Sequence, residues 1–167
     1  KHLVFNAVGY LWKKELPNGT PQRISQGKDF EFEPAFSADG NSMVYTSWND
    51  ELGGALNILS MKPGAVPTKI TSEKAIYRNP SFAPDGKSIV FQKEDGSNSM
   101  GPAYTSKPGI YIMPVSGGAP VFIHNKGYLA SFNGKGDRLY YQAGGGMNIL
   151  YSSCKTDGTD ERAHLKS

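Results

Sequence analysis

Short apolar stretches alternate with glycine- and proline-containing turns along the whole chain, and none of them has the three-to-four-residue spacing of an amphipathic helix. The segment 34–45, PAFSADGNSMVY, aligns without gaps with 80–91, PSFAPDGKSIVF, which lies 46 residues later. A third copy at 130–141, ASFNGKGDRLYY, follows after a further 50 residues and keeps the turn glycine. A repeat of this period predicts one supersecondary unit that is used several times.

Each copy has the residue pattern of a β-hairpin. Phe36 and Phe82 end one apolar run, and the Asp-Gly pairs at 39–40 and 85–86 supply residues that tolerate a positive φ before the next run begins. Two more short apolar runs, separated by a glycine-containing turn, follow each hairpin. Each repeat therefore predicts four antiparallel strands.

Four-stranded units at this spacing predict an all-β fold, a β-propeller fragment of about four blades of four-stranded antiparallel sheet. The blades are expected at about 1–25, 26–71, 72–124 and 125–167, so that one partial propeller fills 1–167. The first blade is incomplete, because its N-terminal apolar run fits the second-strand slot of the repeat. A β-sandwich, the competing architecture, needs alternating strands but no repeated motif.

One aromatic residue recurs at the same slot of the repeat, just before the turn, as Phe36, Phe82 and Phe132. Periodic aromatic residues are typical of propeller blades. We expect the three rings to occupy equivalent buried positions between blades.

The repeated motif resembles the P-x-F-S-P-D-G-K-x-I-x-F consensus of TolB-like β-propellers, with one conservative change at 80–91 and slightly more at 34–45. The later I-Y and G-G-x-P elements of that family have counterparts at 110–114 and 117–120. The resemblance covers nearly the whole chain.

A narrower resemblance concerns the segments 77–82 and 104–111, which are similar to the propeller part of bacterial proteins that join a TolB-like propeller to an amidohydrolase domain. It implies a periplasmic or secreted parent protein whose hydrolase chemistry lies on a separate metal-dependent barrel. TolB-like propellers close with six or more blades. We therefore expect the rest of the parent protein, or a second copy of the chain, to complete the ring.

Composition narrows the chemistry further. The net charge of +3 is spread along the chain without a run of five lysines or arginines, which argues against a nucleic-acid partner, and no apolar run is long enough for a membrane span. His2, His124 and His164 fall on different predicted strands, Cys154 is the only cysteine, and no G-x-S-x-G motif is present. The sequence therefore indicates no metal site, no cofactor and no catalytic residue.

Binding residues are expected on the loops at the end opposite the Asp-Gly turns. Glu31 and Glu33 are two apart, so on a regular strand they point to one side and could share a proton or hold a cation; alternatively they are solvated and pair with Arg78. Trp48 and Tyr104 could stack on a sugar or peptide side chain, or pack between blades. The candidate binding residues are Glu31, Glu33, Trp48, Asp50, Tyr77, Arg78, Tyr104 and Tyr128.

Three functions follow from this sequence, one of which is a purely structural role in covering another domain, favoured if the blade faces expose a large apolar patch. The first is a non-catalytic propeller segment that serves as a binding or scaffolding module of a larger exported protein, with a protein, peptide or glycan ligand. The alternative is a hydrolase or lyase that acts on a glycan or peptide at the mouth of the propeller. The sequence identifies neither the ligand nor the substrate.

Overall fold

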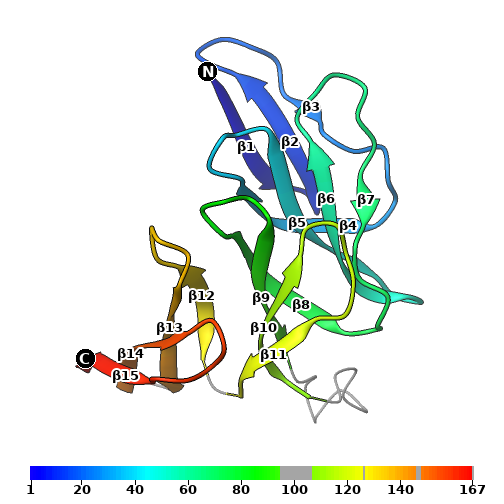
Figure 1. Cartoon of the computed structure of the whole chain (residues 1–167). Helices are drawn as coiled ribbons and strands as arrows, with labels where there is room; N and C mark the ends of the chain where they lie inside the picture. The colour runs from blue at the N-terminus through cyan, green and yellow to red at the C-terminus, as the bar shows by residue number, and fades with distance from the viewer. Residues whose placement is uncertain (95–106, 126, 146–147, 167) are drawn as a thin grey trace.

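The structure is a computed structural model that describes residues 1–94, 107–125, 127–145 and 148–166. Within these ranges it contains fifteen β-strands and no helix, grouped into four separate antiparallel sheets that follow one another in chain order (Figure 1). The described residues contain no helix long and apolar enough to cross a membrane. The expected fold class, a fragment of about four propeller blades, is confirmed.

The four sheets have three, four, four and four strands, and neighbours in each sheet are consecutive in the chain. The first sheet consists of β1 (His2–Ala7), β2 (Tyr10–Glu15) and β3 (Gln22–Arg23), and the second of β4 (Phe30–Phe36), β5 (Ser42–Asn49), β6 (Gly53–Ser60) and β7 (Thr68–Lys69). The third consists of β8 (Ile76–Phe82), β9 (Ser88–Glu94), β10 (Gly109–Pro114) and β11 (Val121–His124), and the fourth of β12 (Tyr128–Phe132), β13 (Arg138–Gly145), β14 (Asn148–Lys155) and β15 (Arg162–Lys166).

The first strand of each complete sheet carries a bulge at the same repeat slot. Glu33 of β4, Asn79 of β8 and Leu129 of β12 have φ values of 50°, 50° and 54°, and the pairing register with the next strand shifts at each of them. A left-handed backbone is rare for residues other than glycine, so its recurrence at one slot is a property of the repeat. The slot accepts three different side chains.

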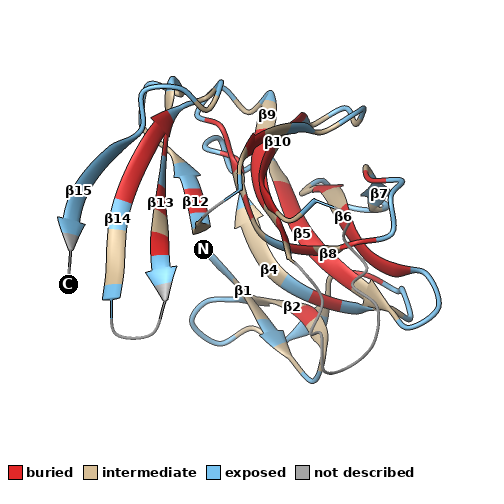
Figure 2. Ribbon diagram, turned by 90° about the horizontal axis from the view of Figure 1, so that it is seen from below, coloured by how far each residue is buried: buried red, intermediate tan, exposed pale blue. Residues whose placement is uncertain are grey.

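The core lies between sheets, because successive side chains on a strand point to opposite faces. On β5, Met43 and Tyr45 pack with Leu11 of the first sheet, while Val44 packs with Phe91 of the third. This two-sided packing explains why the middle strands are buried almost continuously (Figure 2). A third cluster between the last two sheets contains Val90, Ile110, Leu139, Tyr141 and Cys154.

The expectation that the three repeated phenylalanines share a buried environment is wrong. Phe82 is 9% exposed, whereas Phe36 is 44% exposed and Phe132 is half-buried, although each ring sits in the same register against the following strand. Phe82 packs with Val44 of the preceding sheet. The sheet that precedes Phe36 has three strands, whereas the sheets that precede Phe82 and Phe132 have four.

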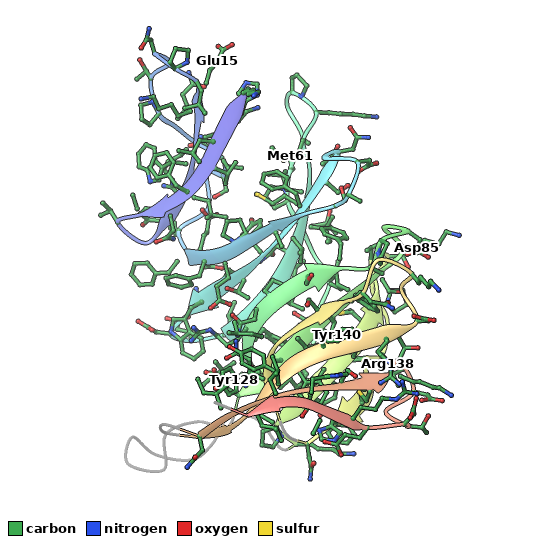
Figure 3. The ribbon with its side chains drawn as sticks, turned by 90° about the vertical axis from the view of Figure 1, so that its left-hand side faces the viewer. Glu15, Met61, Asp85, Tyr128, Arg138 and Tyr140 are labelled. Atoms are coloured by element: carbon green, nitrogen blue, oxygen red, sulfur yellow. The ribbon has the colours of Figure 1, made fainter. Side chains whose placement is uncertain are left out.

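The row of sheets is open at both ends. Only consecutive sheets are in contact among the described residues, and the first and last sheets lie at opposite ends of the row (Figure 1). Figure 3 labels Arg138 and Tyr140 on the last sheet. The exposed apolar side chains of this sheet include Tyr140, Tyr151 and Leu165, and the strand register puts these three on one face.

Candidate functional site

A hollow of about 690 Å³ lies between the second and third sheets. It is at the end of the blades opposite the Asp-Gly turns, because β4 begins with Phe30 paired to Trp48 and β8 begins with Ile76 paired to Glu94. Its volume is that of a site for a small molecule or a few residues of a peptide. The lining residues are Asn6, Phe32, Glu33, Thr46, Ser47, Trp48, Gly54, Ile76, Tyr77, Arg78 and Glu94.

An ion pair crosses this hollow from one blade to the next. The Nε of Arg78 donates to Oε1 of Glu33 at 2.6 Å, and the backbone N–H of Asn79 donates to Oε2 of the same carboxylate at 2.5 Å. The second contact of the guanidinium, to Glu94, is longer at 3.7 Å. Both oxygens of Glu33 are therefore engaged by the third sheet, and this carboxylate joins two bulges of the repeat.

Glu31 lies elsewhere, so of the two alternatives the shared carboxylate site is wrong, whereas the pairing with Arg78 is found for Glu33. Glu31 is only 3% exposed; its Oε2 accepts the backbone N–H of Leu11 at 3.0 Å, and its Oε1 accepts the hydroxyl of Ser25. The bulge at Glu33 breaks the regular alternation on which the expectation rested. Glu31 therefore fastens the first sheet to the second, and Glu33 fastens the second to the third.

Aromatic rings form the apolar part of the hollow. Phe32, Trp48 and Tyr77 all line it, and Phe32 is 37% exposed. The indole Nε1 of Trp48 donates to Oδ1 of Asp50 at 2.8 Å, and the hydroxyl of Tyr77 donates to the backbone oxygen of Glu73 at 2.8 Å. Burial, with a smaller contribution from the carboxylate of Glu73, raises the pKa of Tyr77 to about 12. The phenol is therefore neutral at physiological pH.

The remaining sequence candidates are not part of this hollow. Asp50 lines a smaller neighbouring depression together with Asp29 and Glu51, and Trp48 belongs to both. Tyr128 begins β12 on the last sheet and does not line the hollow. Tyr104 lies outside the described residues.

Seven of the eleven lining residues were not among the sequence candidates, and Phe32 and Glu94 are the two of them with the largest bearing on the chemistry of the hollow. Phe32 holds the repeat slot of Arg78, 46 positions earlier, so the repeat alignment could have identified it. Glu94 joins the site only because β9 pairs with Ile76 at that point, and no sequence motif indicates it.

The described residues contain no group of three or more histidine, cysteine, aspartate or glutamate residues that could hold a metal ion. Cys154 is fully buried, and burial raises the pKa of its thiol to about 11, so it is not a thiolate nucleophile at neutral pH.

No known family model and no curated protein sequence matches the chain. Several solved structures have the same fold. A TolB structure from Agrobacterium tumefaciens is 15% identical with a TM-score of 0.65, and the match covers 99% of this chain and 77% of that one. A chain of the nidogen/laminin complex is 15% identical with a TM-score of 0.71, over 99% and 62% of the two chains.

An oligogalacturonate lyase in complex with manganese is 13% identical with a TM-score of 0.74, over 99% of this chain and 50% of that one. The chain thus spans between half and about three quarters of the length of these structures. At such low sequence identity, the structural similarity shows a shared fold alone. Together with the repeated blade motif, it shows that the chain has the fold of a run of blades from a TolB-like β-propeller.

Proposed function

We propose that the chain is a non-catalytic binding module, with its ligand site in the hollow between the second and third sheets. The single observation that carries the proposal is the pair of accessible aromatic side chains, Phe32 and Trp48, in a space of about 690 Å³ that also contains the Glu33–Arg78 ion pair. A concave, mostly apolar surface with a few placed polar groups is typical of ligand sites. The surrounding blades hold these side chains on strands, which limits their motion.

The ligand is a short peptide or an oligosaccharide. Aromatic rings give a large contact area with few rotors to freeze, which suits both the apolar face of a sugar and a peptide side chain. Thr46, Ser47 and Asn6 add hydroxyl and amide groups to the lining, although each of them already makes a hydrogen bond within the fold.

Amide mapping by NMR tests this function. The isotopically labelled chain is titrated with panels of tripeptides and oligosaccharides, and perturbed resonances are expected to cluster on Phe32, Tyr77 and their strand neighbours. Trp48→Ala is expected to abolish the response. The matched control is Tyr140→Ala, because Tyr140 is an exposed aromatic residue on the last sheet, away from the hollow (Figure 3). Perturbations centred elsewhere, or no binding by any probe, would contradict the proposal.

The enzymatic alternative has weaker support. It requires carboxylates with freedom to act as acid and base, whereas both oxygens of Glu33 accept hydrogen bonds from Arg78 and Asn79. Incubating the same peptide and oligosaccharide panels with the purified chain is expected to leave them intact. A product that appears with the native chain and not with Glu94→Gln would favour the alternative.

The module belongs, we propose, to a larger exported protein whose further blades or domain complete the ring. The resemblance to TolB-like repeats supports export, and the resemblance to amidohydrolase fusions suggests that any hydrolase chemistry resides in another domain. The exposed outward face of the last sheet supports a covering partner, which is either the rest of the parent or a second copy. Sedimentation of the isolated chain is expected to detect self-association at micromolar concentration, and a monodisperse 18.1 kDa species would argue against this assembly.

A further inference from the structure

The surface around the hollow has a net negative charge, whereas the chain as a whole has a net positive charge. The chain carries a net charge of +3. Around the hollow and the depression that shares Trp48, carboxylates outnumber cations by two. The carboxylates are Glu33, Glu94, Asp29, Asp50 and Glu51, and the cations are Arg78, Lys28 and Lys74, whose Nζ donates to the backbone oxygen of Glu51.

The carboxylates of the hollow differ in how fully they are engaged. Glu33 accepts one hydrogen bond on each oxygen, from Arg78 and from the N–H of Asn79. Glu94 has only the 3.7 Å contact to Arg78 among the described residues, and 37% of its side chain is exposed. Among the described residues, Glu94 is therefore the less firmly held of the two carboxylates.

Two accessible aromatic residues line the same hollow as this partly engaged carboxylate. They are Phe32 and Trp48, whereas Tyr77 is only 3% exposed and packs in the core. The negative face of an aromatic ring attracts an ammonium or guanidinium group, and its apolar surface covers the aliphatic stem that carries the charge. Both the negative ring faces and the surplus of carboxylates would repel an anionic ligand.

We infer that the hollow selects a cationic group on an apolar stem, the ammonium of a lysine side chain or the guanidinium of an arginine side chain in an extended peptide. The stem lies against Phe32 and Trp48, and the charge lies beside Glu94. This inference rests on the proposed binding function and adds the ligand class. A free polyamine offers the same chemistry, so the test must separate the two sources.

The fluorescence of Trp48 gives a direct readout. Trp12 and Trp48 are the two tryptophans of the chain, and Trp12 lies on β2 outside the hollow, so Trp12→Phe leaves one reporter in the site. This variant is titrated with capped Gly-Lys-Gly, Gly-Leu-Gly and Gly-Glu-Gly peptides and with putrescine. The lysine peptide is expected to bind roughly tenfold more tightly than the glutamate peptide, and its affinity should fall as sodium chloride is raised.

Adding Glu94→Gln to the Trp12→Phe chain is expected to lower the affinity for the lysine peptide about fivefold and to leave the affinity for the leucine peptide unchanged. Glu15→Gln is the matched control, since Glu15 is exposed at the end of β2 and does not line the hollow. Tighter binding of putrescine than of the lysine peptide would assign the site to a free amine.

The possible failures are distinguishable. Equal affinity for the three peptides, or no effect of Glu94→Gln, would overturn the cationic selectivity while the binding function stands. Binding of oligosaccharides alone in the NMR panel would also overturn it. If no probe bound in either experiment, the proposed binding function itself would be wrong.

Discussion

Glu31 gives the sharpest test of how the blades are joined. Glu31→Ala removes a carboxylate that accepts the N–H of Leu11 and the hydroxyl of Ser25, all within a buried contact between the first two sheets. A hydrogen bond to a charged group contributes about 1.5–3 kcal/mol, and a buried N–H left without an acceptor costs about 1–3 kcal/mol. Removing the carboxylate also removes the free-energy cost of burying its charge, which offsets part of this loss. We therefore expect roughly 2–4 kcal/mol of destabilisation.

Urea denaturation of the whole chain measures this loss. With an m-value of about 2 kcal/mol/M, a loss of 3 kcal/mol lowers the midpoint by about 1.5 M. Glu31→Gln should retain most of the stability, because its amide oxygen can still accept the Leu11 N–H. Glu33→Ala is the control: its partner Arg78 is 45% exposed, so the loss should be only about 1 kcal/mol.

A weak effect of Glu31→Ala would contradict the role assigned to this carboxylate. If Glu31→Ala were no more destabilising than Glu33→Ala, the buried carboxylate would not be what fastens the two sheets. Hydrogen exchange adds a local readout, because the Leu11 amide should exchange faster in Glu31→Ala than in Glu31→Gln. An unchanged Leu11 exchange rate would contradict the assigned contact.

Three further predictions concern the repeat and its core. Gly86 has a φ of 69° and Gly117 a φ of 87°, so both substitutions strain the backbone. The β-branched side chain of Gly86→Val should cost about 1–3 kcal/mol, more than the methyl group of Gly117→Ala, and equal urea midpoints would refute this ranking. Phe82→Ala should cost about 3–5 kcal/mol and Phe36→Ala roughly 0.5 kcal/mol, and the reverse order in the same assay would refute the environments described. Cys154 should react with a thiol reagent at pH 8 only after unfolding. Its ordinary pKa of 9.0 is raised to about 11 by burial, so stability should fall as pH rises above about 9, and a denaturation midpoint flat from pH 8 to 11 would contradict this.

Local chemistry was enough to predict the strands and their order. The Asp-Gly turns at 39–40 and 85–86 and the repeat period identify hairpins because these signals act over a few residues. Strand alternation likewise explains why Met43 and Val44, adjacent in the chain, pack against different neighbouring sheets.

The site was harder to predict because it depends on backbone details and on pairing. The left-handed bulge holds a glutamate, an asparagine and a leucine in its three copies, so no residue type signals it, and the directions of Glu31 and Glu33 could not be inferred. Glu94 enters the hollow through strand pairing. Phe36 is exposed although it holds the same repeat slot as the buried Phe82, so the repeat motif alone does not encode burial at this slot.

The row of sheets has a thermodynamic consequence that follows from its connectivity. Since each sheet packs only on its neighbours in the chain, stability should approximate a sum of blade and interface terms, as in a linear array. A terminal sheet has one interface and an inner sheet has two, so unfolding should begin at the ends and move inward. The hollow lies between the two inner sheets, where the array would be the last part to open.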